Sequence, residues 1–121
     1  MEFNDSTTSI FEKAIEFIHQ HYCEELRLGR VSKSVGVNEN YLSRLFRKNA
    51  GESFNQYVAN LRIEESKRLL KEGNKIIDLP EKIGYMSSVH FRRVFKKVTG
   101  VSPKVYRNSL GLDTTMKADQ E

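Results

Sequence analysis

Apolar residues recur at helical spacing along most of this 121-residue chain, and alternating strand patterns are nearly absent. The first apolar stripe consists of Ile10, Ala14, Ile15, Ile18 and Tyr22. We expect its helix to start at Ser9, because Ser9 and Glu12 match the S-x-x-E capping box. The stripe ends near Cys23, and the pattern as a whole predicts an all-α fold.

A short helical stretch and a further helix follow, separated by a glycine. The stretch runs from Leu28 to Val35, after which Gly36 suits a left-handed C-cap. Asn38 can then cap the next helix. The inward residues of that helix are Tyr41, Leu42, Leu45 and Phe46. This layout is typical of helix-turn-helix proteins, which present their second helix to a DNA major groove.

A longer helix connects the two halves of the chain. Ser53 and Gln56 form another capping box in front of it. We expect it to run from Phe54 to about Lys71 and to end at Gly73, which gives a length on the order of 25 Å. Its apolar positions are Phe54, Tyr57, Val58, Leu61, Ile63, Leu69 and Leu70.

The second half repeats the pattern of the first. An apolar stretch from Leu79 to Ile83 is interrupted by Gly84, and Ser87 can cap the next helix. Ser102-Pro103 opens a last short helix, since proline suits the first helical position. The inward residues of the helix after Ser87 are Phe91, Val94 and Phe95.

Pro80 restricts where the supporting helix of the second half can begin. Inside a helix, proline removes a hydrogen bond and clashes with the preceding turn. Asp78 and Glu81 are three residues apart and resemble a capping box. We therefore expect Asp78 to be the N-cap of a short helix from Leu79 to about Ile83, with Pro80 in its first turn.

The repeat is visible residue by residue. The sixteen residues LSRLFRKNAGESFNQY from Leu42 align without gaps on FRRVFKKVTGVSPKVY from Phe91. Solenoid proteins need about three or more copies of a repeat. Two copies joined by a long helix instead predict a binding protein with two lobes. The identical pairs are Arg44/Arg93, Phe46/Phe95, Lys48/Lys97, Gly51/Gly100, Ser53/Ser102 and Tyr57/Tyr106.

These patterns divide the chain into five segments. Residues 9–52 are a first helix-turn-helix subdomain, 53–73 the connecting helix and 74–109 a second helix-turn-helix subdomain. Residues 1–8 are expected to be a disordered start or linker, and 110–121 a disordered tail. The polar, acidic start favours a chain that is the output domain of a larger regulator rather than a complete small one.

Charge is distributed unevenly around a net value of +4. The segment from Met1 to Arg30 carries six acids and three bases, whereas the segment from Lys82 to Arg107 carries seven bases and no acid. Such a basic block attracts a polyanion. No apolar run approaches the ~18–20 residues of a membrane span, the start is unlike a secretory signal, and Cys23 has no second cysteine to pair with.

The sequence resembles the DNA-binding domain of the AraC/XylS family of bacterial transcription regulators. The resemblance covers about Ile10 to Arg107 and rests on YLSRLFRKNAGESFNQYVANLRIEESKRLL and IGYMSSVHFRRVFKKVTGVSPKVYR. It implies seven helices, with the third and sixth reading successive major-groove segments on one DNA face. The family favours a small residue in the first helix of each unit, where this chain has Ser32 and Pro80.

The resemblance and the helical wheel together supply candidate contacts. Arginine can bond two guanine acceptors, and valine can meet a thymine methyl group. The expected base contacts are Asn40, Ser43, Arg44, Ser88, Val89, Arg92 and Arg93. The expected phosphate contacts, which position without specifying, are Arg47, Lys48, Arg62, Lys96, Lys97, Lys104 and Arg107. Arg62 could equally be a local ion-pair partner.

Other interpretations are weaker. His19 and Cys23 share a helix face but His21 points away, so we expect no metal site, and we expect no cofactor. The sequence has no nucleophile–base–orienter set, so we do not expect an enzyme. His90 is interpreted as a partly buried structural histidine. The rival classes are a helical protein-interaction module and a non-specific nucleic-acid binder.

The expected partner is double-stranded DNA, and the resemblance adds RNA polymerase. We expect a cytoplasmic protein without a membrane partner, monomeric as this fragment. The full-length protein could dimerise through a domain missing here.

Overall fold

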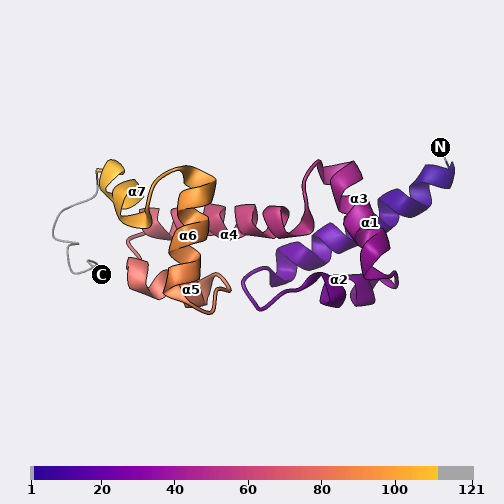
Figure 1. The fold of residues 1–121 in the computed structure, drawn as a ribbon, viewed down its shortest axis with the longest axis horizontal. Coiled ribbons are helices and arrows are strands. Elements are labelled where there is room, and N and C mark those ends of the chain that lie inside the picture. The colour runs from indigo at the N-terminus through magenta and orange to yellow at the C-terminus, as the bar shows by residue number, and fades with distance from the viewer. Residues whose placement is uncertain (1, 112–121) are drawn as a thin grey trace. The chain divides into compact units, whose positions relative to one another are not determined.

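The computed structural model describes the backbone of residues 2–111 and the side chains of residues 9–111. Residues 2–111 contain seven α-helices and no strand (Figure 1). The predicted all-α class and the seven helices are confirmed. The helices are α1 (Glu2–His21), α2 (Leu28–Val35), α3 (Glu39–Ala50), α4 (Phe54–Lys71), α5 (Leu79–Lys82), α6 (Ser88–Thr99) and α7 (Pro103–Ser109), with a 3-10 turn η1 (Ile76–Asp78) before α5.

The predicted start of the first helix is wrong. α1 begins at Glu2, so Ser9 lies inside the helix and residues 2–8 are helical rather than a disordered linker. A capping box is a local pattern that also occurs within helices, where the backbone N–H of the serine already has a partner one turn earlier. Most of the expected tail, residues 112–121, lies outside the described residues.

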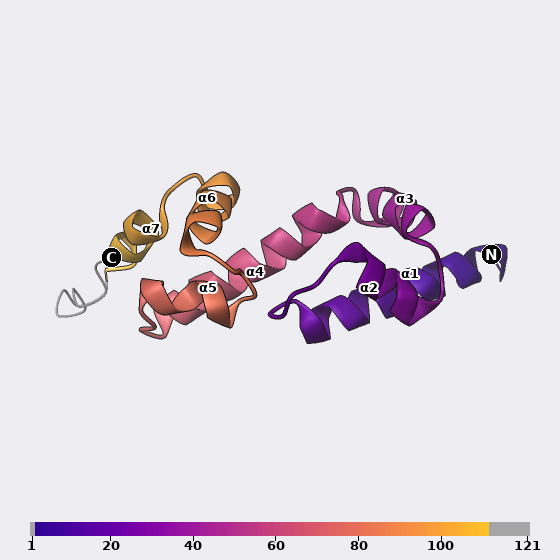
Figure 2. The same cartoon turned by 60° about the horizontal axis from the view of Figure 1, so that its bottom comes forward.

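The chain divides into two compact units, the first ending at Val58 and the second beginning at Ala59. The boundary falls within α4, the helix expected to connect the two halves. In the first unit α1 packs against both α2 and α3, and α2 packs against α3, as Figure 2 shows from a second side. In the second unit α5 follows directly from η1, and α6 packs against α7.

Each unit has its own apolar core. The buried side chains of the first are Ala14, Ile18, Leu26, Val31, Leu42, Leu45, Phe46, Phe54 and Val58. Those of the second are Ile63, Leu70, Ile76, Leu79, Ile83, Tyr85, Phe91 and Phe95. Both sets largely follow the predicted helical stripes. The predicted apolar residues that are only half-buried are Ile10, Ile15, Tyr22, Tyr41, Tyr57, Leu61, Leu69 and Val94.

Phe46 and Phe95 occupy equivalent positions of the repeat and are fully buried. The Phe46 ring meets Tyr57 edge to face, with centroids 5.6 Å apart and an angle of 64°. The Phe95 ring meets Tyr106 in the same way, at 5.7 Å and 67°. Because Tyr57 and Tyr106 are also equivalent in the repeat, the same aromatic pair fixes α3 in one unit and α6 in the other.

Side-chain caps begin four helices where the sequence predicted them. Asn38 accepts from the N–H of Tyr41 at the start of α3, and Ser87 from the N–H of His90 at the start of α6. Ser53 and Ser102 cap α4 and α7 in the same way. Equivalent glycines of the repeat end α3 and α6, since Gly51 and Gly100 are their C-caps with φ of 75° and 90°.

The supporting helices of the two units differ. In α2, Ser32 is buried and its hydroxyl donates to the carbonyl of Gly29 at 3.0 Å, as expected for a serine in place of alanine. α5 has only four residues, from Leu79 to Lys82, with Pro80 in its first turn as predicted. Both Leu79 and Pro80 are buried, so packing holds a helix too short to be stable alone.

The predicted capping role of Asp78 is wrong. Its side chain makes no cap hydrogen bond, and its backbone is already helical, with φ −87° and ψ −10°. Instead η1 runs directly into α5, and the N–H of Leu79 bonds to the carbonyl of Ile76. The backbone is therefore already helical where α5 begins, and α5 starts without a side-chain N-cap.

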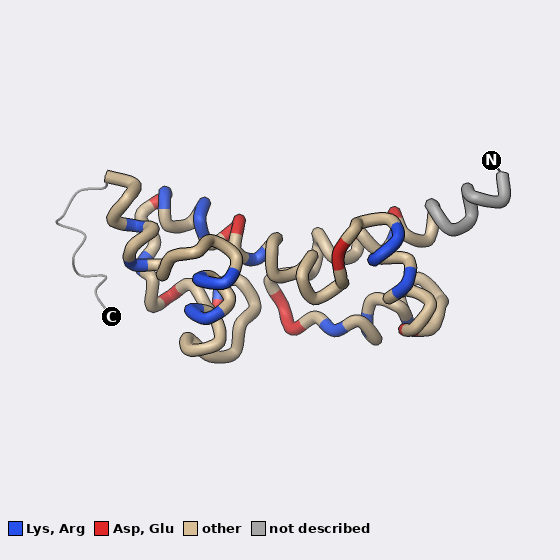
Figure 3. Tube along the Cα trace, turned by 45° about the horizontal axis from the view of Figure 1, so that its top comes forward, with Lys and Arg blue, Asp and Glu red and all other residues tan. Residues whose placement is uncertain are grey.

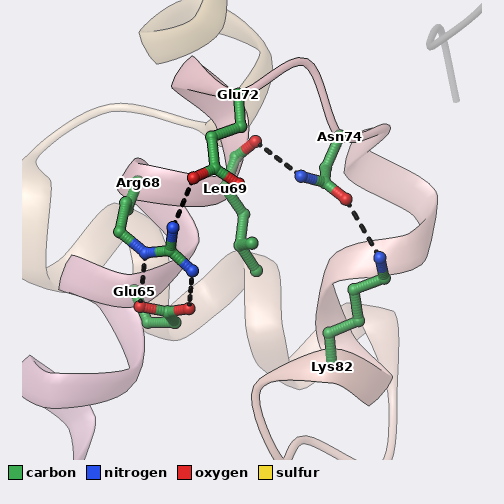
Figure 4. Close-up of polar contacts among 6 residues, drawn as sticks. All are labelled: Glu65, Arg68, Leu69, Glu72, Asn74 and Lys82. Carbon is green, nitrogen blue, oxygen red and sulfur yellow. Dashed lines mark hydrogen bonds and ion pairs between the residues drawn. The ribbon is translucent and has the colours of Figure 1, made fainter.

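Polar contacts tie the end of α4 to α5 (Figure 4). Asn74 donates to the carbonyl of Leu69 and accepts from the ammonium of Lys82, both at 3.0 Å. Arg68 forms ion pairs with Glu65 on α4 and with Glu72, the residue after α4. These ion pairs lie around the end of α4, are partly exposed and contribute little stability. The hydrogen bonds of Asn74 join the end of α4 to α5, whose apolar side chains also share one core.

Arg62 of α4 packs on a buried tyrosine. Its guanidinium carbon lies 4.9 Å from the ring centroid of Tyr85. Burial raises the pKa of Tyr85, while the charge of Arg62 and a hydrogen bond from it act in the opposite direction. A raised folded-state pKa means that Tyr85 contributes stability below the unfolded pKa of about 10, and that this contribution disappears as pH rises through the folded value.

We predict that Arg62→Ala raises the pKa of Tyr85 further, because the change removes both contributions that lower it. The measurement is a phenolate absorbance titration, with Tyr85→Phe subtracted to isolate this tyrosine. An unchanged titration in Arg62→Ala would contradict the contact.

We also predict that Phe95→Ala lowers the free energy of unfolding by about 3–5 kcal/mol, through reduced burial and a residual cavity. Denaturant unfolding measures this. Val105→Ala, which truncates an exposed residue of the same unit, is the matched control and should change stability by less than about 0.5 kcal/mol. Equal stability of Phe95→Ala and wild type would show that the inward face of α6 is misassigned.

Candidate nucleic-acid interface

The outer face of α3 carries the residues expected to read bases in the first unit. Asn40 and Arg44 are exposed, and Ser43 is half-buried. The guanidinium carbon of Arg44 lies 6.0 Å from the ring centroid of Tyr41, one turn earlier. This contact is a weak cation–π interaction at an exposed site, so it leaves the arginine able to reach a ligand.

The outer face of α6 carries the corresponding residues of the second unit. Ser88, Val89, Arg92 and Arg93 are all exposed. Val89 is 71% exposed, which is unusual for a large apolar side chain in this fold. On each helix, two of these residues lie on the side away from the buried phenylalanines: Asn40 and Arg44 on α3, and Val89 and Arg93 on α6. Ser43 and Ser88 lie closer to the buried face.

The cations expected to meet phosphate fall into two groups. Most are exposed, and Figure 3 marks lysines and arginines in blue along the trace. The exposed ones are Arg47, Lys48, Lys96, Lys97 and Lys104. Two differ: Arg62 is half-buried against Tyr85, and Arg107 is only 7% exposed. The basic block of the sequence contained no sign that Arg107 would be buried on α7.

Two residues near the start of α6 were not described correctly by the sequence: the exposure of His90 was mispredicted, and Met86 was not considered. His90 is exposed rather than partly buried, and its ring meets Tyr85 edge to face at 5.1 Å. Met86 is 87% exposed in the turn before α6. It precedes the helix, so the wheel that assigned the other contacts did not include it. Aligning it with Val37 through the repeat would have drawn attention to it.

Other kinds of site receive no support from the described side chains. Within residues 9–111, no group of three or more histidine, cysteine, aspartate or glutamate side chains could hold a metal ion. His19 instead contacts the Tyr57 hydroxyl at 2.8 Å. None of the helices among the described residues is both long and apolar enough to cross a membrane.

A family model described as "Helix-turn-helix domain" matches residues 31–109. Among curated proteins, the HTH-type transcriptional regulator YobQ of Bacillus subtilis is 37% identical over 101 residues. The match covers 83% of this chain and 42% of YobQ, so the chain spans less than half the length of that relative.

Solved structures agree with this assignment. The C-terminal domain of AraT, a response regulator from Geobacillus stearothermophilus, matches with a TM-score of 0.80 and 32% identity, over 83% of this chain and 84% of that one. The DNA-binding domain of AdpA, solved with a target DNA, shares the fold with a TM-score of 0.77 at 20% identity, over 92% and 97% of the two chains. The family is one of transcription regulators rather than an enzyme class. This chain belongs to the helix-turn-helix family of AraC-type DNA-binding domains.

Proposed function

We propose that this chain regulates transcription by binding duplex DNA with sequence specificity, each unit placing one helix, α3 or α6, in the major groove. One observation carries the proposal. Arg44 and Arg93 occupy equivalent positions of the repeat, both are exposed, and both lie on helices whose opposite faces are buried. Duplicated, outward-facing arginines on capped helices are the arrangement that reads guanine through the groove.

The base contacts proposed are those of the two exposed faces. An amide such as Asn40 can bond two atoms of adenine, and arginine two atoms of guanine. The full set is Asn40, Ser43 and Arg44 in the first unit, and Ser88, Val89, Arg92 and Arg93 in the second.

Phosphate contacts are proposed for the exposed cations only. Arg107 is not proposed as a phosphate contact because it is buried. Arg62 packs on Tyr85, and its phosphate contact is predicted only by the family resemblance. The proposed set is Arg47, Lys48, Lys96, Lys97 and Lys104.

The partners and setting of the whole protein are further parts of the proposal. We propose that it acts on RNA polymerase in the cytoplasm, and we place signal sensing and dimerisation in a domain outside this chain. The coverage of 42% of YobQ supports a longer parent protein. As an isolated fragment the chain is proposed to be monomeric.

We predict that Arg44→Ala or Arg93→Ala weakens binding to the preferred duplex by about 1–3 kcal/mol and relaxes specificity at the bases each arginine reads. The preferred duplex is found by selection from a randomised pool, and affinity is then measured on it and on scrambled sequence. A specific reader should favour the selected duplex by roughly a thousandfold or more. Equal losses on selected and scrambled DNA would limit these arginines to phosphate. If wild type does not prefer the selected duplex over scrambled DNA, the chain is a non-specific nucleic-acid binder.

A second prediction concerns salt. The double change Lys96→Ala and Lys97→Ala should reduce the slope of log affinity against log salt by about 0.9 for each phosphate that is no longer neutralised. The preferred sequence should not change, because phosphate contacts carry no base information. The control is Lys71→Ala with Lys75→Ala, which removes the same positive charge from two exposed lysines outside α6. A slope identical to wild type would mean that Lys96 and Lys97 face away from DNA.

A further inference from the structure

We infer that Met86 and Val89 together read the methyl groups of thymine in the half-site bound by α6. The inference rests on the proposed function and adds to it a residue outside the recognition helix. It also specifies the chemistry by which the second unit selects its bases.

Met86 buries little of its side chain against the rest of the fold. It lies immediately before the N-cap Ser87, and an apolar residue there commonly packs on the fourth helical residue, which is Phe91. Phe91 is fully buried, but Met86 is 87% exposed, so that packing is not made. Val37, the equivalent residue of the first unit, is half-buried. A large apolar side chain is therefore exposed to solvent at the start of α6 without a structural reason.

Val89 is a second exposed apolar side chain near the start of α6. It is the second residue of α6 and 71% exposed, although a β-branched residue gains nothing in an exposed helix position. Its counterpart in the first unit is Asn40, a polar residue. The N-terminal residues of a recognition helix are those that contact base edges, so Met86 and Val89 stand at the reading end.

The charges around these two residues favour DNA as the occupant. Arg92 and Arg93 follow on the same helix and are exposed, and Lys96 and Lys97 lie one turn further. From Lys82 to Arg107 the chain has no acidic residue. In the major groove of a duplex, the thymine methyl is the apolar group that a base edge offers. Met86 and Val89 can therefore contact a thymine methyl group while the neighbouring arginines and lysines bind the DNA.

The two units would then read different chemistry. Asn40 and Arg44 favour adenine and guanine in the first half-site through hydrogen bonds. Met86 and Val89 favour thymine in the second, beside guanines read by arginine. The preferred DNA site should therefore be asymmetric, although the two units derive from one repeated pattern.

Uracil tests the inference, because it differs from thymine only by lacking the methyl group. The wild-type preferred duplex is selected from random sequence, and the bases whose preference relaxes in Arg93→Ala define the half-site of α6. We expect thymine among or next to them. Replacing it with uracil should weaken wild-type binding about fourfold for each methyl group that the two side chains bury. The double variant Met86→Ala with Val89→Ala should bind thymine and uracil duplexes equally, near the wild-type affinity for uracil.

Single variants and one control separate the possible outcomes. Met86→Ala should lose part of the thymine preference, and Ile77→Ala, which truncates another exposed apolar residue of the second unit, should lose none. Unchanged melting temperatures show that both variants fold. The inference is overturned if the half-site lacks thymine, if wild type binds both duplexes equally, or if Met86→Ala keeps the full preference. That last result would show that Met86 does not contact the thymine methyl group. In all three cases the selected duplex is still preferred over scrambled DNA, whereas loss of that preference in wild type would overturn the proposed function itself.

Discussion

The packing of one phenylalanine beneath each recognition helix is the constraint on which the proposed interface depends. Phe46 and Phe95 are fully buried and each meets a tyrosine from the following helix at nearly the same distance and angle. Fixing one residue of a helix in this way fixes the rotation of the whole helix about its axis. Arg44 and Arg93, two positions earlier, must then point to solvent.

The helices that support α3 and α6 differ between the two units. The first uses an eight-residue helix, α2, in which a buried serine bonds back to its own chain. The second uses η1 followed by the four residues of α5, with Asn74 bridging α4 and Lys82. Gly84, with φ of 93°, lets the N–H of Tyr85 bond to the carbonyl of Pro80 and so ends α5 abruptly. Pro80 is accommodated in the first turn of α5, where a backbone N–H would have no partner within that helix.

The sequence predicted most of the fold because its signals are local. Four caps and the apolar stripes each depend on residues within about one helical turn, and these were found where expected. Ser9 and Asp78 show the limit: both fit a capping pattern, but the chain before them is already helical, and short motifs do not report this. Arg107 and Met86 show another limit. Whether each side chain is buried depends on tertiary packing, which the periodicity of a single helix does not describe.

The separate cores of the two units have a consequence for how such a protein can diversify. The exposed faces of α3 and α6 are each supported by side chains of their own unit, and the boundary between the units falls inside one continuous helix. A substitution on one face therefore leaves the support of the other intact. Recognition becomes modular, and regulators descended from one ancestor could exchange half of an operator while continuing to recognise the remainder.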